Sequence, residues 1–123
     1  MSSRMYLSAG DRRKLDRLMR KIYALFRSDD QWTVELHIIN GDEEYTNKAN
    51  VSFNTIGITD YEHCRIILDY RDDLLSTFIH ECLHAIYQDH SESDILDLEE
   101  FMINRISPLR AKRLLVLLLD HLD

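Results

Sequence analysis

Glycine and proline are scarce in this sequence, and their scarcity limits the folds open to it. The 123 residues include only three glycines and one proline. Folds built from many short strands, such as β-sandwiches and propellers, need turn residues at regular intervals. The chain therefore favours long helices beside a small sheet. Its length suits one domain, which we expect to span residues 1–123.

Composition indicates a folded chain with an uneven charge distribution. Apolar residues make up 45% of the sequence and charged residues 30%, which is typical of folded rather than disordered proteins. The net charge is -7, yet residues 1–27 carry +6, so the other 96 residues carry -13. Net acidity argues against a protein whose main task is to bind nucleic acid. We expect the basic segment to be the solvated face of one helix.

The sequence lacks the signals for secretion, membrane insertion and a disulfide framework. The N-terminal residues lack the apolar segment and small-residue cleavage site of a secretory signal. No apolar run approaches the roughly 20 residues that cross a bilayer. Cys64 and Cys82 are too few for a disulfide framework. These absences predict a cytoplasmic protein without a membrane partner.

Capping residues and apolar periodicity predict four helices. They are expected over about residues 11–27, from Asp72 onward, from Ser91 to about Ile106, and from Pro108 onward. The last of them contains the run Leu114–Leu119, which is apolar on more than one side. We expect its leucines either to be buried in the core or to mediate self-association with another copy.

Three segments rich in β-forming residues predict a small sheet. They are Trp32–Ile39, a stretch around Asn50–Thr59, and Arg65–Asp69. The last two would form an antiparallel hairpin in the simplest topology. With the helices, they predict an α+β fold with a mixed or antiparallel sheet of about three strands.

The segment that carries chemistry is the HExxH sequence from His80 to His84. Residues i and i+4 of a helix lie on one face, so the two imidazoles can bind one zinc ion. Glu81 is rotated away from the ligand positions, where its carboxylate can take a proton from an activated water. Both histidines fall opposite the apolar stripe of their helix, which suggests the floor of a cleft.

A third zinc ligand should follow the HExxH helix. The candidates are His90, Glu92, Glu99 and Glu100. Glu99 ranks first because it lies near the middle of an apolar helix face, where an unpaired carboxylate is costly. Folding the two helices back on each other around residues 89–91 would also bring Glu99 level with His80. His90 is the alternative ligand, reaching back from a loop, and Glu100 ranks third.

The order of these elements resembles the zincin metallopeptidases, above all the minigluzincins and small bacterial and phage proteins regarded as metallopeptidases. The similar segments are Gly57–Tyr61, Arg65–Asp69, Thr77–Ala85, Ser91–Glu92 and Leu98–Glu100. The resemblance implies a sheet lying over the active-site helix, with a peptide or protein substrate bound along an edge strand. It also implies zinc ligation by His80 and His84, catalysis by Glu81, and a downstream glutamate ligand matched by Glu99.

Two functions follow from this resemblance and from the motif. The first is a zinc-dependent peptidase, a hydrolase that cleaves peptide bonds with Glu81 as general base. The second is a non-catalytic zinc-binding protein of the zincin fold, with a regulatory or interaction role, such as a phage carries to act on a host partner. A third hypothesis, an interaction module that uses the basic first helix or the leucine-rich last helix, rests only on the uneven charge.

Overall fold

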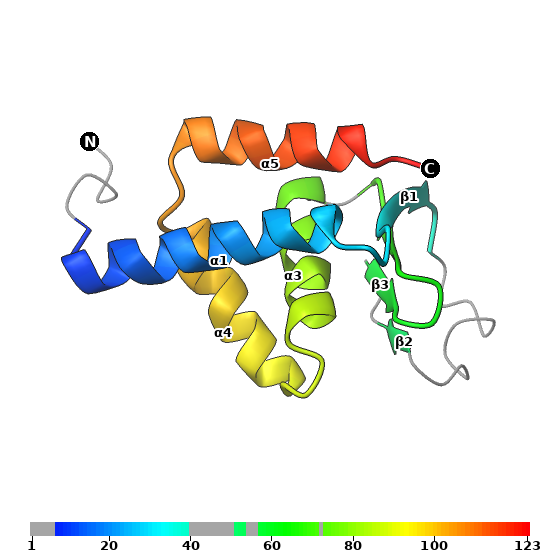
Figure 1. Cartoon of the computed structure of the whole chain (residues 1–123), viewed down its shortest axis with the longest axis horizontal. Helices are drawn as coiled ribbons and strands as arrows, with labels where there is room; N and C mark the ends of the chain where they lie inside the picture. The colour runs from blue at the N-terminus through cyan, green and yellow to red at the C-terminus, as the bar shows by residue number, and fades with distance from the viewer. Residues whose placement is uncertain (1–6, 40–50, 54–56, 72) are drawn as a thin grey trace.

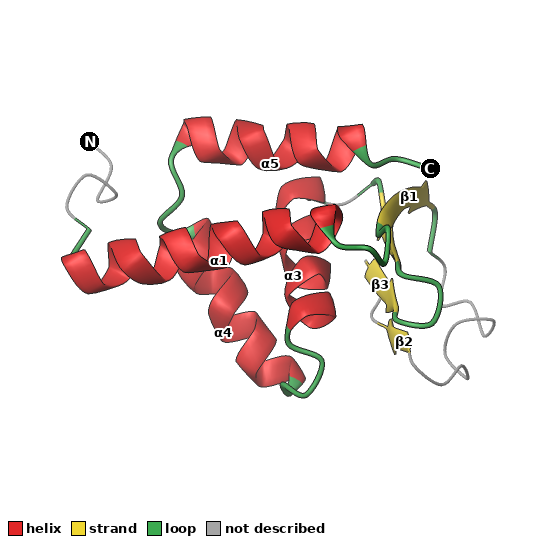
Figure 2. Cartoon of the chain, viewed as in Figure 1, coloured by secondary structure: helices red, strands yellow, loops and turns green. Residues whose placement is uncertain are grey.

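The chain forms an α+β structure in which a small sheet stands at one end of a group of helices (Figures 1 and 2). The computed structural model describes residues 7–39, 51–53, 57–71 and 73–123. Its helices are α1 (Ala9–Arg27), α3 (Leu74–Ile86), α4 (Glu92–Ile103) and α5 (Pro108–Asp120). Its strands are β1 (Thr33–His37), β2 (Val51–Phe53), β3 (Gly57–Asp60) and β4 (Arg65–Asp69).

Serine caps start three of the four described helices, as their sequence pattern predicts. The hydroxyl oxygens of Ser8, Ser91 and Ser107 accept hydrogen bonds from the backbone N–H groups three residues further on. Such caps satisfy donors that the first helical turn would otherwise leave unpaired. Pro108 takes the first position of α5, where its missing N–H costs nothing. The starts of these helices are therefore specified locally.

Helix α3 lies at the centre of the molecule, in contact with α1, α4, α5, β3 and β4. Phe78, Ile79 and Cys82 are completely buried, as the apolar stripe of this helix predicts, and Leu83 is completely buried as well. Helix α1 contributes five buried apolar residues to the same core, at the spacing of one helix face. In Figure 1 α1 crosses in front of α3, and α5 runs beside α1 in the same direction.

The sheet has four strands in the order β1-β4-β3-β2, and its pairing is mixed. Strand β1 runs parallel to β4, whereas β3 is antiparallel to both β4 and β2. The stretch predicted as one strand around Asn50–Thr59 is thus two strands that pair with each other, although Asn50 itself lies outside the described residues. The predicted hairpin of β3 and β4 is present, joined by residues 61–64.

Helix α5 is only partly buried. Leu114, Leu117 and Leu118 face the core, whereas Leu115 and Leu119 are exposed by 37% and 61% of their surface. Of the two expectations for this helix, burial therefore holds for only part of the leucine run, and self-association through the exposed leucines stays a prediction. In the part of the chain that the structure describes, no helix has the length and apolarity to cross a membrane.

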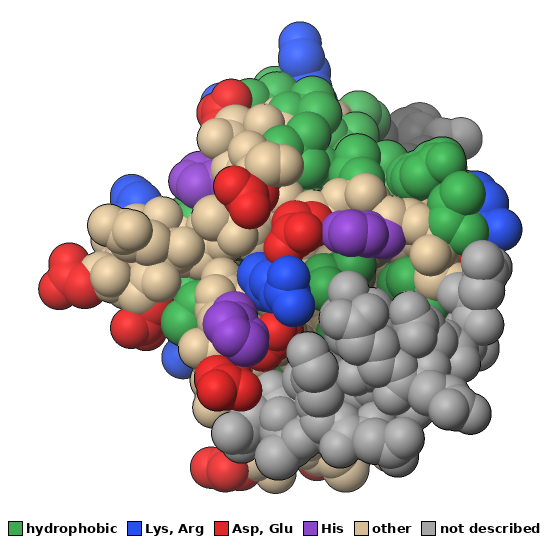
Figure 3. Space-filling view, turned by 90° about the vertical axis from the view of Figure 1, so that its right-hand side faces the viewer, with side chains coloured by type: hydrophobic (Ala, Val, Ile, Leu, Met, Phe, Trp, Pro, Cys, Tyr) green, Lys and Arg blue, Asp and Glu red, His purple; other side chains and the backbone are tan. Residues whose placement is uncertain are grey.

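A network of charged side chains links the three neighbouring strands β1, β4 and β3 of the sheet. Arg65 on β4 contacts Glu35 on β1 at 3.1 Å and Asp60 on β3 at 2.9 Å. His37 and His63 extend this network from either side through Glu35 and Asp60. In Figure 3, which views the sheet end of the molecule, acidic, basic and histidine side chains gather near the centre of the face. These pairs link three strands that are not all consecutive in sequence.

Candidate metal centre

The HExxH residues form the middle of α3. The carboxylate of Asp73 caps the N-terminus of this helix by accepting from the backbone N–H of Ser76. One helical turn separates His80 from His84, and their ring centroids lie 4.8 Å apart. Both imidazoles are buried, with only 4% and 5% of the residue surface exposed. The histidine face of α3 is therefore covered rather than forming the open floor of a cleft.

Helix α4 supplies the cover by folding back over α3 after residue 90. Its first residue, Glu92, places one carboxylate oxygen 2.7 Å from Nε2 of His80 and the other 2.6 Å from Nε2 of His84. The three side chains offer ligand atoms that all lie within 4.8 Å of one another, so the group could hold a metal ion. Among the described residues no other group of three metal-ligating side chains is this close.

The contact between His80 and Glu92 does not have the direction of a hydrogen bond. Nε2 of His80 is buried and makes no hydrogen bond with any described residue, although Oε1 of Glu92 is 2.7 Å away. The opposite ring nitrogen, Nδ1, bonds to Oε1 of Glu99 at 2.7 Å. Nε2 of His80 thus lies close to a carboxylate oxygen without forming a hydrogen bond to it, so this nitrogen could serve as a metal ligand.

Glu99 is held on both of its oxygens. While Oε1 accepts from His80, Oε2 accepts from the hydroxyl of Ser76 at 2.8 Å. The prediction that helix folding brings Glu99 level with His80 is confirmed by this contact. Its carboxylate, however, meets the Nδ1 side of the ring, on the side opposite Glu92. In zinc proteins this arrangement fixes the orientation and tautomer of a ligating histidine.

Burial disfavours the charged form of both histidines, but the two side chains have different neighbours. For His80 the hydrogen bond to Glu99 and the charges of Glu81 and Glu92 outweigh burial and raise the pKa. For His84 burial prevails over the attraction of Glu92, so its pKa is lowered. Glu99 is also partly buried, yet hydrogen bonds from His80 and Ser76 lower its pKa. A lowered pKa keeps Glu99 ionised as a partner for His80 at neutral pH.

The carboxylate of Glu81 lies against β3. It is completely buried, and the hydroxyl of Thr59 donates to its Oε1 at 2.7 Å. Gly57, on the same strand, leaves the space that this carboxylate fills. A Cβ atom at position 57 would lie 2.8 Å from Oε2 of Glu81, a distance that side chains do not tolerate. Strand β3 therefore positions Glu81 in two ways: the hydroxyl of Thr59 binds its carboxylate, and Gly57 leaves room for it.

The structure separates the candidate third ligands. Glu92 lies on both histidines and Glu99 behind one of them, whereas Glu100 is exposed. His90 is also exposed, and its ring stacks beside that of Tyr87 at 4.7 Å. The sequence ranking placed Glu99 above Glu92 because it read burial from helix periodicity. A side chain at the first position of a helix can reach back over the preceding turn, which periodicity does not capture.

Comparison with known proteins adds no relative. No family model matches the chain, and no curated protein or solved structure matches it either. The functional argument therefore rests on the geometry of this chain alone.

Proposed function

We propose that the chain is a zinc-dependent peptidase in which His80, His84 and Glu92 hold the metal and Glu81 is the general base. The observation that carries this proposal is the convergence of two Nε2 atoms and one carboxylate at the HExxH helix. Two histidines with one glutamate is a ligand set that catalytic zinc sites use, because it leaves a coordination position open. The α+β layout supports assignment to the zincin fold.

The buried Nε2 of His80 supports metal binding more strongly than simple pairing of charges. A histidine that only neutralised Glu92 would donate to it along a hydrogen bond, and His80 does not. Its donor, Nδ1, is already engaged by Glu99. The donor set of imidazole nitrogens and carboxylate oxygen suits zinc. Glu99 then acts as the residue that orients His80, in place of the ligand role expected from the sequence.

The chemistry divides between the metal and the protein. A bound zinc ion would polarise the peptide carbonyl and make water a stronger nucleophile near neutral pH. Glu81 would take the proton from that water at its carboxylate and deliver it to the leaving amine. The hydrogen bond from Thr59 to Oε1 of Glu81 helps to orient this carboxylate. Gly57 provides the room that this position requires.

A second function is favoured by the burial of Glu81. No surface of this residue is exposed, and both histidines are almost fully covered by α4. A zinc ion in such a site could stabilise a regulatory or interaction protein without performing hydrolysis. Two free cysteines, Cys64 and Cys82, agree with a cytoplasmic location for either function.

Replacement of Glu81 by glutamine distinguishes these functions. The zinc-loaded protein is incubated with a quenched fluorescent peptide library, and cleavage is followed with time. Glu81→Gln should retain zinc and lose about 10²- to 10⁴-fold in rate, the contribution of a general base. Glu100→Gln, an exposed change on α4, is the matched control and should cleave normally. A wild-type protein that binds zinc but cleaves nothing supports the non-catalytic function.

A further inference from the structure

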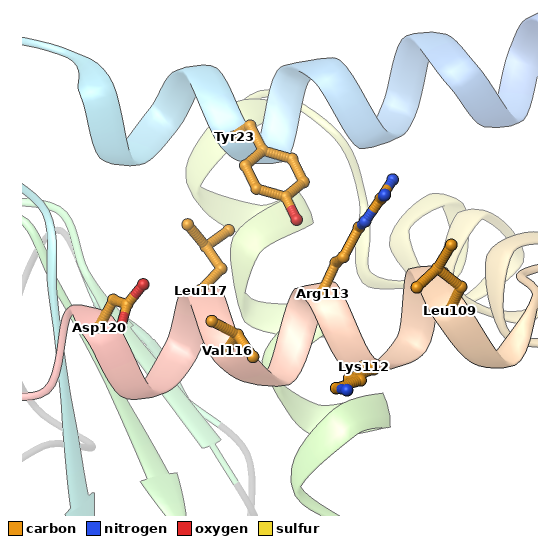
Figure 4. Close-up of a pocket in the computed structure, with 7 residues that line it drawn as sticks. All are labelled: Tyr23, Leu109, Lys112, Arg113, Val116, Leu117 and Asp120. Carbon is orange, nitrogen blue, oxygen red and sulfur yellow. The ribbon is translucent and has the colours of Figure 1, made fainter.

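A groove between α1 and α5 lies apart from the metal centre. Its lining includes Arg20, Tyr23 and Arg27 from α1 and Leu109, Arg113 and Val116 from α5. Five cations line it against two carboxylates, those of Asp16 and Asp120. Two adjoining hollows of about 320 and 460 Å³ make up this α1/α5 groove, and Tyr23 and Arg113 belong to both. Figure 4 shows Tyr23 reaching from α1 toward α5, between Leu117 and Arg113.

The cations of α1 divide into two groups with different surroundings. Lys14 and Lys21, on one side of the helix, lie over the rings of Phe101 and Tyr87 at 4.2 and 5.3 Å. They are therefore used in packing α1 against the helices below. The arginines that line the α1/α5 groove lie on the other side and have no such partner. The basic character of the first helix thus has two separate explanations.

Most arginine side chains of the groove have no ion-pair partner among the described residues. Arg110 pairs with Asp16 at the rear of the groove. Within the described ranges, the side chains of Arg20, Arg27 and Arg113 form no ion pair or hydrogen bond, and all three are exposed. Such a concentration of positive charge is unusual in a chain whose net charge is -7. It favours a partner that brings carboxylates, because the arginine fork matches a carboxylate with two parallel hydrogen bonds.

Apolar surface lies directly beside these charges. Leu109 is 56% exposed and Val116 is 44% exposed, and the ring of Tyr23 lies between the two helices. An occupant with apolar side chains would remove this surface from water. A nucleic acid would meet the arginines but would leave Leu109 and Val116 uncovered.

We propose that the α1/α5 groove binds an acidic, amphipathic helical segment of a partner protein. Apolar residues at i, i+3 and i+4 of that segment would pack on Tyr23, Leu109 and Val116, in the manner of a helix bound in a groove. Glutamates or aspartates on its flanks would pair with Arg20, Arg27 and Arg113. The groove shares no residue with the metal centre, so this function does not depend on zinc.

The test begins with selection from a random library of 16-residue peptides displayed on phage, with the whole chain as target. A parallel selection from the same library uses the Arg20→Glu/Arg113→Glu variant as target. Enriched peptides should be acidic and carry apolar residues at helical spacing. Enrichment of basic or neutral peptides, or no enrichment, would overturn the proposal. So would equal recovery on the variant, provided that its circular dichroism matches that of the wild type.

Affinity measurements then locate the binding site. The strongest enriched peptide is labelled, and its binding is followed by fluorescence anisotropy. Arg113→Glu should weaken binding at least about tenfold, whereas Arg17→Glu, an exposed change on α1 outside the groove, should alter it less than about twofold. Val116→Asp should weaken it as well, through loss of apolar contact. If a labelled random-sequence DNA duplex binds in the place of any peptide, the groove is a nucleic-acid site and the proposal fails.

Discussion

Gly57 determines where the carboxylate of Glu81 can lie. Glycine is needed here for space, because a Cβ atom would approach Oε2 of Glu81 to 2.8 Å, Cγ to 2.9 Å and Cδ to 3.0 Å. We predict that Gly57→Ala destabilises the fold by about 1–3 kcal/mol, the usual cost of overpacking a buried site. The displaced Glu81 should also lower any peptide cleavage. Chemical denaturation measures the first effect.

Gly10 offers a matched control for that substitution. A Cβ atom there would have Ser8 Oγ as its nearest neighbour, at 3.9 Å, an ordinary contact. Gly10→Ala lies in the first turn of α1 and should leave stability unchanged or raise it by up to about 1 kcal/mol. If both variants were equally stable, the close contact at Gly57 would not constrain Glu81.

Glu92 and Glu99 are predicted to differ in their effect on zinc affinity. Glu92→Gln replaces an oxygen of the proposed ligand and should weaken zinc binding more than any other single change on α4. Glu99→Gln alters only the partner of His80, and changes to such orienting residues typically cost 10- to 100-fold. Competition with a chromophoric chelator ranks the two variants. A larger loss for Glu99→Gln would restore Glu99 as the third ligand.

Much of this candidate site could be predicted from single residues, but the contact of Glu92 with both histidines could not. The HExxH spacing is enough to put His80 and His84 on one face of a helix. The choice between Glu92 and Glu99 depends on where α4 folds back over α3, which is set by tertiary packing. Thr59 and Gly57 come from a strand more than 20 residues before Glu81, and no local pattern links them to it.

At the level of elements, locally specified features were predicted better than long-range pairings. The capping boxes Ser8–Asp11 and Ser91–Asp94 mark the starts of α1 and α4 within a residue or two. Strand β4 was predicted with its observed bounds. The parallel pairing of β1 with β4 joins segments about 30 residues apart, and β-propensity carries no information about such partners. For the same reason, β2 and β3 appeared as one strand.

The buried carboxylate of Asp69 links the end of β4 to the residue Ile39 just after β1. The stability that it contributes should depend strongly on pH. Asp69 is 1% exposed, and hydrogen bonds from Arg71 and from the backbone N–H of Ile39 hold its pKa well below the ordinary value. Since the folded-state pKa lies below the unfolded one, this carboxylate stabilises the fold above about pH 4. That stabilisation is lost as the pH falls toward the folded-state pKa.

The corresponding prediction concerns Asp69→Asn. The variant should be less stable than the wild type at pH 7, and the two should approach each other as the pH falls below about 4 toward the folded-state pKa of Asp69. Urea unfolding at several pH values measures this convergence. Asp29→Asn, an exposed change after α1, should follow the wild-type curve. A constant difference between Asp69→Asn and wild type at every pH would show that the ionised carboxylate is not responsible.

For the whole molecule, a metal between α3 and α4 would couple binding to folding. The ligands come from both helices, so an unfolded chain cannot assemble them and zinc should bind the folded state preferentially. At a free zinc concentration about 100 times the Kd, the folded state gains about 2.7 kcal/mol. We predict that chelation lowers the Tm by roughly 10 °C. Differential scanning calorimetry should find no such change for His84→Ala.

Native mass spectrometry of the zinc-saturated protein tests the central claim most directly. We predict one zinc ion per wild-type chain, none on His80→Ala/His84→Ala, and one retained on Glu81→Gln. Circular dichroism of each variant would establish that the chain remains folded. A wild-type chain that stays metal-free at saturating zinc, or a double variant that still carries the ion, would contradict the account.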